Sequence, residues 1–334
     1  MNPNDTKQRG VMICASMLLT FFLLTACTQT PQYTVYKVGK EGLSLKFLPN
    51  SPPQKVYDND EFSTYLFVEN KGAFDVVKSQ DESGNALSNS YAVIALTYDP
   101  YYLLLSSEDT GARQDVDQAQ RRIYLRGKSV YHPRGEGESF EFGFHANKLE
   151  GQREQPQTTI LFTLCYPYET RLSKEVCIDK DFYNLDERKK VCTIKDLSFS
   201  QGQGAPIVIS KIEPRALRIS QDTLVEFNIV VENAAGGNVI TYDKNKEIAD
   251  QCISAKPDND EWNQVNIEAY LLGQKLDCKS GTIKLLENKG EIRCRTSQAV
   301  SGEARNFLSV LQVKLDYLYQ SSISKNIQIV RSEQ

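Results

Sequence analysis

Six cysteines have the most readily anticipated chemistry in this chain of 334 residues: Cys165, Cys177, Cys192, Cys252, Cys278 and Cys294. No CxxC pair occurs, and neither histidine stands at a ligand-like spacing from them, so we expect disulfides and no metal site. Locality favours the pairs Cys177–Cys192 and Cys278–Cys294. Cys165 and Cys252 are then either paired across the two halves of the chain or free.

Catalytic motifs are missing from the sequence, which contains no GxSxG, P-loop, HExxH or EF-hand spacing. The acidic turns at 57–61 and 257–261 carry oxygen ligands that suit calcium, although solvated turns are the commoner use of such residues. We therefore expect a protein that is not an enzyme and takes no cofactor.

Clustered aromatic residues are the strongest indication of binding. Tyr98, Tyr101 and Tyr102 surround a proline bend, and Trp262 lies in a polar loop. Exposed aromatic rings stack on sugars or anchor protein partners, whereas buried rings only fill a core. We take these four residues as the candidate binding residues, with burial as the alternative.

The N-terminus has the layout of a targeting segment. Lys7 and Arg9 precede an apolar run over 11–26, which is shorter than the roughly 20 residues of a membrane span. The run ends in Leu-Thr-Ala-Cys at 24–27, which resembles the lipobox of prokaryotic lipoproteins. That resemblance implies cleavage before Cys27 and a diacylglyceryl group on its sulfur. A retained membrane helix is the alternative, and both place the rest of the chain outside the cytoplasm, anchored to the membrane.

The charge balance excludes one class of partner. The formal net charge is −4 and the sequence pI is about 5.5, with no cluster of basic residues after the apolar run. Nucleic-acid binders concentrate Lys and Arg, so we expect no nucleic-acid partner.

Alternating apolar residues predict β-strands through most of the chain. Phe140, Phe142 and Phe144 alternate over one short segment, and Val225 and Phe227 begin another. Glycine and proline separate these segments, and no convincing amphipathic helix occurs across 40–180.

The sequence at the end of one predicted strand occurs a second time in the chain. Val-Glu-Asn at 68–70 recurs at 231–233, and both copies are followed by glycine, which we expect to turn the chain at Gly72 with a positive φ. Each half of the chain has about seven strand candidates. This predicts an all-β fold of two tandem immunoglobulin-like β-sandwich domains. The expected divisions are a signal segment 1–26, a tether 27–34, a first domain 35–190 with long loops, a linker 191–204 and a second domain 205–334.

The repeated apolar-x-apolar-x-Asn-x-Gly ending resembles the CARDB class of immunoglobulin-like domains, which occur on prokaryotic surfaces and are associated with adhesion. The stretches at 42–62, 164–181 and 202–209 resemble uncharacterised membrane-anchored surface proteins of small-genome archaea. The resemblance implies a fold and a location, and it brings no site residues.

We therefore expect a lipid-anchored cell-surface protein that binds a protein or glycan, or that has a structural role in the envelope. Two other classes of function stay open. One is an accessory or catalytic component of surface glycan processing, which would need paired carboxylates in a cleft. The other is an envelope component that assembles with itself through an exposed edge strand.

Overall fold

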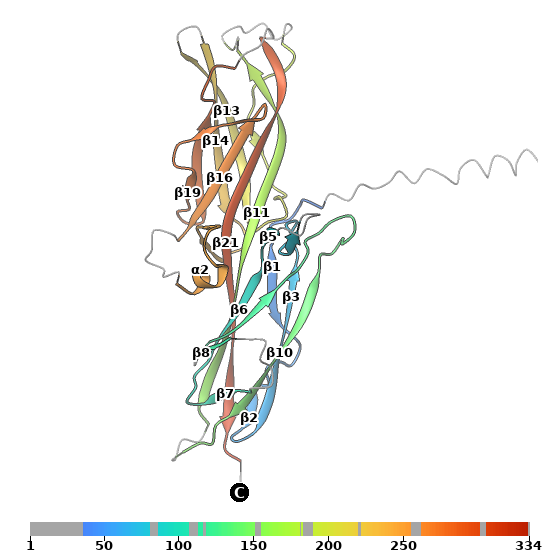
Figure 1. Ribbon diagram of the computed structural model, residues 1–334, viewed down its shortest axis with the longest axis vertical. Helices are drawn as coiled ribbons and strands as arrows, with labels where there is room; N and C mark the ends of the chain where they lie inside the picture. The colour runs from blue at the N-terminus through green and yellow to red at the C-terminus, as the bar shows by residue number, and fades with distance from the viewer. Residues whose placement is uncertain are drawn as a thin grey trace, which may run out of the picture. The chain divides into compact units, whose positions relative to one another are not determined.

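The computed structural model describes residues 36–80, 86–106, 113–115, 118–150, 155–180, 182, 190–219, 222–254, 262–300 and 305–332. Within these ranges the chain is almost all β, in several antiparallel sheets, and includes one short helix, α2 (Ile248–Ser254) (Figure 1). The predicted all-β sandwich fold is confirmed. The predicted signal segment, the tether and Cys27 lie outside the described residues.

The strands of the described ranges form four sheets. A four-stranded sheet has the order β1-β3-β10-β7, and a five-stranded sheet has the order β12-β13-β14-β20-β18. The main path of a ten-stranded sheet runs β17-β16-β21-β11-β6-β9-β8, with β2, β15 and β19 paired at its sides, and β4 pairs with β5.

The first sheet contains β1 (Leu43–Phe47), β3 (Glu61–Asn70), β7 (Leu103–Leu105) and β10 (Gly137–Ala146). The second contains β12 (Leu197–Ser198), β13 (Ile207–Ile219), β14 (Asp222–Asn233), β18 (Asp277–Cys278) and β20 (Lys289–Arg295). The ten-stranded sheet contains β2 (Lys55–Tyr57), β6 (Ala92–Thr97), β8 (Arg113–Asp115), β9 (Gln118–Ile123), β11 (Gln157–Asp179), β15 (Asn238–Ile240), β16 (Gln264–Leu271), β17 (Gln274–Lys275), β19 (Thr282–Lys284) and β21 (Asn306–Val330), and the pair consists of β4 (Lys78–Gln80) and β5 (Ala86–Asn89).

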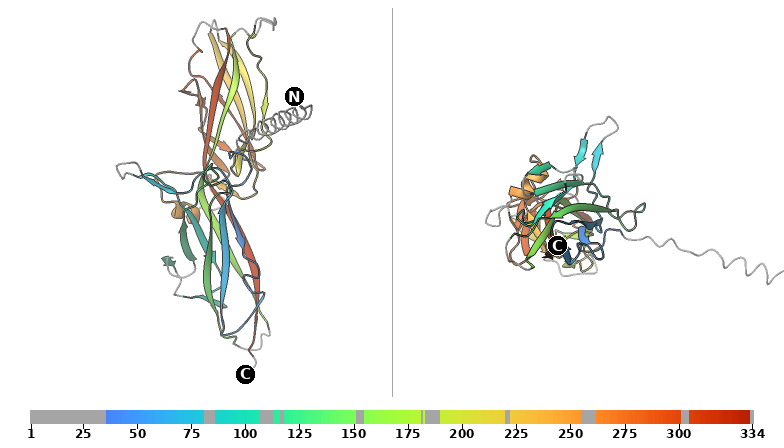
Figure 2. Two further views of the ribbon diagram at one scale, coloured as in Figure 1. Left: turned by 90° about the vertical axis from the view of Figure 1, so that its right-hand side faces the viewer. Right: turned by 90° about the horizontal axis from the view of Figure 1, so that it is seen from below.

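Two unusually long strands form the centre of the ten-stranded sheet. β11 and β21 pair antiparallel without a register shift from Gln157↔Gln328 to Asp179↔Asn306 (Figure 1, Figure 2). β6 joins β11 through 161–165, and β16 joins β21 through 311–316. The two strands therefore carry different neighbours at their two ends.

The strand pattern of the first half recurs in the second. β1 pairs with β3, β3 with β10, β6 with β9 and β6 with β11, all antiparallel. β13 pairs with β14, β14 with β20, β16 with β19 and β16 with β21 in the same order along the chain. The duplicated strand ending in the sequence is thus one part of a duplicated set of six strands.

The long ladder joins the two copies. β21 lies in the predicted second domain, yet it pairs along β11 of the predicted first domain, and its last residues pair with β2. Residues 36–334 form one compact unit. The division into two immunoglobulin-like domains at 191–204 stays a prediction, and β12 falls inside that predicted linker.

The core follows from strand alternation. In β10 the side chains of Phe140, Phe142 and Phe144 are buried while their neighbours are more exposed, as their spacing predicts. The rings of Phe47 and Phe142 contact Phe162 of β11, with centroids 5.9 and 4.9 Å away, so the four-stranded sheet packs on β11. Among the described residues, the buried apolar side chains lie between residues 43 and 329, and most of them form one core cluster. We therefore expect residues 36–334 to fold alone.

Candidate binding site

The repeated asparagines close the two copies of the strand ending. Nδ2 of Asn70 and Nδ2 of Asn233 each donate to the carbonyl of the residue four positions later, at 2.8 and 2.6 Å. Tyr168 of β11 donates its hydroxyl to Asn70 Oδ1 at 3.1 Å, and Tyr319 of β21 donates to Asn233 Oδ1 at 3.0 Å. A hydrogen bond between an asparagine and a tyrosine thus attaches each copy of the strand ending to one of the two long strands.

A second pair of tyrosines repeats this arrangement. Tyr166 Oη accepts from the backbone N–H of Leu43 at 3.1 Å, and Tyr317 Oη accepts from that of Ile207 at 3.3 Å. Leu43 and Ile207 are the first residues of β1 and β13. Tyr166 and Tyr317 are fully buried, so we assign them to the fold and not to a site.

Gly72 has a different role from the one its sequence context predicts. Its φ is not positive. A Cβ at this position would lie 1.9 Å from Tyr168 Oη and 2.5 Å from the carbonyl oxygen of Gly204. Close approach of neighbouring groups, and not backbone handedness, therefore requires glycine here.

All six cysteines that were predicted to form disulfides are paired with one another. The bonds are Cys177–Cys192, Cys278–Cys294 and Cys165–Cys252, the last linking positions 87 residues apart. Disulfides of this kind persist in oxidising compartments, which indicates an extracytoplasmic protein. No helix in the described ranges has both the length and the apolar character needed to cross a membrane.

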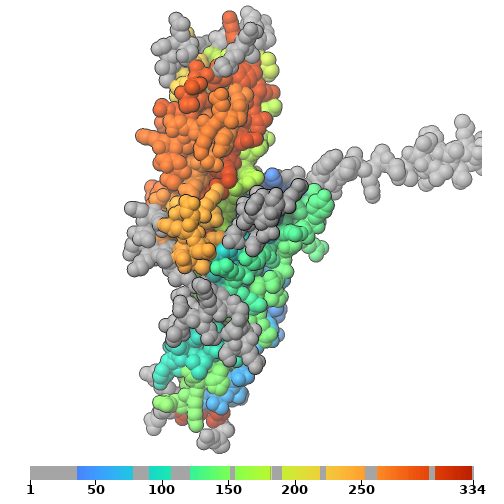
Figure 3. Space-filling view, in the orientation of Figure 1, coloured from blue at the N-terminus to red at the C-terminus, as the bar shows by residue number. Residues whose placement is uncertain are grey.

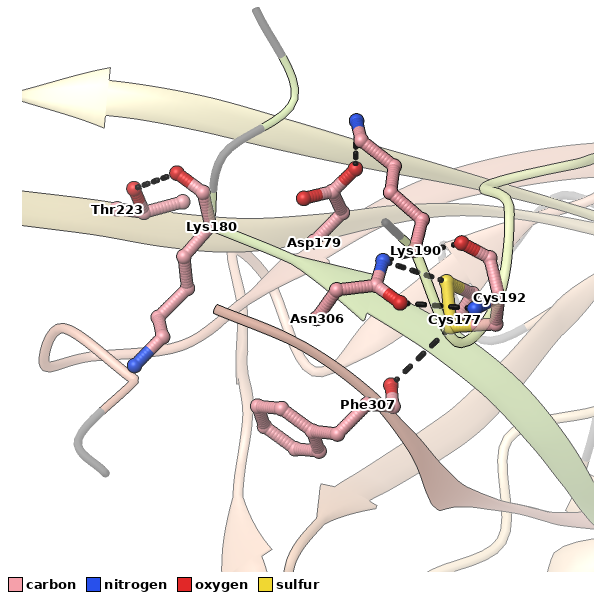
Figure 4. A network of polar contacts seen from close by, with 8 residues as sticks. All are labelled: Cys177, Asp179, Lys180, Lys190, Cys192, Thr223, Asn306 and Phe307. Atoms are coloured by element: carbon pink, nitrogen blue, oxygen red, sulfur yellow. Dashed lines mark hydrogen bonds and ion pairs between the residues drawn. A yellow bond between two sulfur atoms is a disulfide. The ribbon is translucent and has the colours of Figure 1, made fainter. Parts of the chain in front are cut away.

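The Cys177–Cys192 bond lies in a polar network at the end of the long ladder (Figure 4). Asn306 accepts from the N–H of Cys192 at 2.8 Å and donates to its carbonyl at 3.0 Å. Lys190 and Asp179 form an ion pair at 2.7 Å, with side chains 12% and 5% exposed. These contacts hold the two ends of the segment 180–191, so we read the network as structural.

The aromatic residues proposed for binding occupy two separate places. Tyr98 and Tyr102 pack partly against the main core, and Tyr101 is 65% exposed. Trp262 packs on the smaller cluster around the Cys165–Cys252 bond, and its indole Nε1 has no hydrogen-bond partner among the described residues. The structure does not bring Trp262 to the tyrosine bend, and the binding role of these four residues stays a prediction.

In the acidic turn at 57–61, the carboxylate of Asp58 is hydrogen-bonded to other parts of the protein. Asp58 is buried and accepts from the N–H and the hydroxyl of Ser332 at 2.7 and 2.8 Å and from the N–H of Leu149 at 3.1 Å. The turn at 257–261 lies outside the described residues. Where side chains are described, no group of three or more His, Cys, Asp or Glu stands close enough to hold a metal ion.

A group of charged side chains that sequence reasoning did not single out lies midway along the long ladder. Glu169 is directly opposite Asp316, and Arg171 is opposite Lys314. Lys314 Nζ is 2.9 Å from Glu169 and 3.4 Å from Asp316, Arg171 pairs with Glu169, and Lys244 reaches Asp316 at 3.4 Å. We call Glu169, Arg171, Lys314 and Asp316 the charge cluster. Each strand carries two opposite charges two residues apart in the sequence, but that pattern does not show that the two pairs face each other.

The two carboxylates of the charge cluster are shifted in opposite directions. Burial raises the pKa of Asp316, and this outweighs the opposing effect of Lys314 and Lys244. Burial also acts to raise the pKa of Glu169, but hydrogen bonds from Arg171 and Lys314 outweigh it and leave that pKa lowered. Two nearby carboxylates with diverging pKa values are characteristic of acid–base sites and also of structural ion networks.

Several cavities border the charge cluster, and two of them are considered as binding sites. The first, which we call the junction cavity, has a volume of about 550 Å³ and is lined by Glu169, Arg171 and Asp316 together with the aromatic side chains of Phe74 and Tyr242. Tyr242 is half-buried, and burial, followed by the nearby Asp316, raises the pKa of its hydroxyl. The second, the edge cavity, has a volume of about 740 Å³ and lies between the charge cluster and 198–203. Both volumes fall in the range of small-molecule sites, about 300–1,000 Å³.

Comparison with known proteins leaves the family open. No protein-family model matches the chain, and no curated protein matches it. Among solved structures, Escherichia coli alpha-2-macroglobulin activated by porcine elastase aligns with 86% of this chain at 10% identity and a TM-score of 0.18. The chain spans 32% of that protein. A likeness of this degree carries no argument about fold or function.

Proposed function

We propose that this protein is an extracytoplasmic binding protein, anchored to the membrane through Cys27, that takes an oligosaccharide in the junction cavity. One observation carries the ligand class: Phe74 and Tyr242 line the same cavity as the charge cluster. Sugar rings stack on aromatic faces, and their hydroxyls exchange hydrogen bonds with charged groups.

The state of the charge cluster supports binding. Glu169 is 6% exposed and is paired with both Arg171 and Lys314, so its charge is already compensated before any ligand arrives. A neutral, hydroxyl-rich ligand adds hydrogen bonds to such a cluster without introducing an unpaired charge. A strongly charged ligand would have to displace existing ion pairs.

The test is a glycan array with residues 36–334, followed by affinity measurements on Tyr242→Ala and Tyr242→Phe. Loss of the ring should weaken binding about tenfold, whereas loss of the hydroxyl alone should cost less. Tyr57→Ala is the matched control, because Tyr57 is an exposed tyrosine outside the cavity and is not one of the candidate binding residues. Full affinity in Tyr242→Ala with intact melting behaviour would place the ligand elsewhere.

Glycan hydrolysis is a second candidate, favoured by the diverging pKa values of Glu169 and Asp316. Asp316 keeps its proton more readily than an ordinary carboxyl, as a general acid does. Glu169, with its lowered pKa, would act as the partner carboxylate. Turnover of a bound oligosaccharide that Asp316→Asn abolishes while binding persists would establish this activity, and the absence of turnover would leave binding alone.

The anchor has an independent test. Cys27→Ser should release the protein from the membrane fraction of cells and leave the signal segment uncleaved. Unchanged processing and unchanged membrane retention would contradict lipidation at Cys27.

A further inference from the structure

The loop between Leu125 and Gly137 has an apolar tip. Tyr131 is 89% exposed, more than any other large apolar side chain in the described chain, and its neighbour Val130 is 70% exposed. The loop is the green segment preceding β10 in Figure 1, and it belongs to the green surface in Figure 3. Adjacent large apolar side chains with this exposure indicate a contact surface.

The base of the loop is held firmly, so the exposure of its tip is built into the fold. Lys128 donates its backbone N–H to the carbonyl of Gly72 at 2.7 Å, and the N–H of Asn70 donates to the carbonyl of Glu136 at 2.8 Å. Gly135 has a φ of +78°, and a Cβ there would lie 1.9 Å from the carbonyl oxygen of Asn70. The loop is therefore fastened to the end of β3.

The loop is also positively charged. Lys128 and Arg134 form no ion pair with any described residue. Glu136 is near both Arg126, at 4.0 Å, and His132, at 3.8 Å. With three basic residues and one acidic residue over 126–136, the loop carries +2 with histidine neutral, against −4 for the whole chain. The loop thus combines an apolar tip with two cations, Lys128 and Arg134, that no described residue neutralises.

The loop lies on the side of the molecule where the described chain begins. The carbonyl of Gly72, which accepts from Lys128, is followed by the N–H of Ala73, which donates to Gly204 at 2.7 Å. Gly204 in turn donates to the carbonyl of Gly39 at 2.8 Å. Hydrogen bonds between adjacent segments therefore connect the loop to a residue three positions from the start of the described chain.

The tether is short. Tyr36 stands nine positions after Cys27, and an extended chain spans at most about 3.3–3.6 Å per residue, so Tyr36 stays within roughly 30 Å of a lipid on Cys27. At that distance even a weak surface contact occurs at high effective concentration.

We propose that the loop 126–136 contacts the surface of an anionic membrane, with Val130 and Tyr131 entering the headgroup region and Lys128 and Arg134 binding lipid phosphates. Tyrosine is favoured at the membrane interface, and basic residues are attracted to anionic leaflets. A convex tip suits this surface better than it suits a single sugar, which needs a concave site. The contact would orient the junction cavity relative to the membrane, and it rests on the proposed anchor at Cys27.

The experiment attaches residues 27–334 to vesicles through Cys27 itself. The other six cysteines of this segment are in disulfides, so Cys27 is the thiol that reacts with a maleimide lipid. Tyr131→Trp then reports insertion through quenching by brominated lipids, with the unsubstituted chain giving the background of Trp262. Tyr101→Trp is the matched control, because Tyr101 is 65% exposed and lies near Asn147, beyond the opposite end of β10.

In vesicles containing phosphatidylglycerol, we expect a blue shift and bromine quenching at position 131 and neither at position 101. Neutral vesicles, or the double change Lys128→Glu and Arg134→Glu, should abolish both effects. Equal signals at the two positions, or no quenching at 131, would overturn the proposal. A response at 131 to soluble oligosaccharide but not to vesicles would assign the loop to a glycan instead. Because the attachment is chemical, these outcomes do not depend on whether cells lipidate Cys27.

Discussion

Replacing the two repeated asparagines by aspartate should have very unequal effects on stability. Asn70 is fully buried, and its Nδ2 donates to the carbonyls of Phe74 at 2.8 Å and Leu125 at 3.2 Å. Its Oδ1 accepts from the N–H of Gly72 at 3.2 Å and from the hydroxyl of Tyr168 at 3.1 Å. Aspartate has the same shape but keeps only the two acceptor contacts.

The cost at Asn70 follows from the groups that lose a partner. Asn70→Asp removes the side-chain donor of two carbonyls, but Leu125 still accepts from the N–H of Val76 at 3.0 Å. The carbonyl of Phe74 loses its donor, at about 1–3 kcal/mol, and the buried carboxylate that now faces both oxygens costs more than a neutral group would. The free energy of unfolding should therefore fall by about 4 kcal/mol. Asn233 is only partly buried, and Nδ2 donates to Gly237 at 2.6 Å, where water can replace it. Asn233→Asp should cost about 1 kcal/mol.

Urea unfolding of residues 36–334 with the disulfides intact measures both changes as shifts of the midpoint at constant m value. Tyr168→Phe is the control at the buried site, because it removes the hydroxyl contacts to Asn70, Phe74 and Gly204 and leaves the side-chain amide in place. Equal losses for the two asparagine variants, or a larger loss at Asn233, would refute the argument that burial decides the cost.

Three further outcomes are expected. Removing the bond between Cys177 and Cys192 with a double serine variant frees a loop of sequence separation 15 and should lower the free energy of unfolding by about 3 kcal/mol, measured by urea unfolding; an unchanged midpoint would contradict this. Because burial raises the pKa of Asp316 above 3.8, the folded protein binds this proton more tightly than the unfolded chain, so stability falls as pH rises through that raised value. Asp316→Asn should flatten the melting temperature across this pH range and raise it at neutral pH, and a steeper pH dependence would be inconsistent with the shift. Gly135→Ala adds a Cβ at 1.9 Å from a backbone oxygen and should cost more than the roughly 1–2 kcal/mol of a left-handed alanine alone, whereas Gly236→Ala, with φ +77° in open space, should cost only that amount; the two melting temperatures compare them.

Much of the local structure could be predicted because it is recorded in short stretches. Alternating phenylalanines mark the buried face of β10, since successive side chains of a strand point to opposite faces. The repeated Val-Glu-Asn marks the ends of β3 and β14, where asparagine bonds the turn that follows. Locality also favoured two of the three disulfides.

Only tertiary structure decided the features that depend on distant partners. The Cys165–Cys252 bond needs β11 and α2 to meet, and the charge cluster needs β11 and β21 to share one register. Glu169 and Asp316 are separated by 147 residues, so no local pattern could show that they face each other across a ladder. The partial burial of Trp262 and the exposure of Tyr131 also depend on which other segments cover them. Strand periodicity determines which face of a strand is apolar, whereas long-range pairing determines what that face meets, and the candidate sites of this protein are made by that pairing.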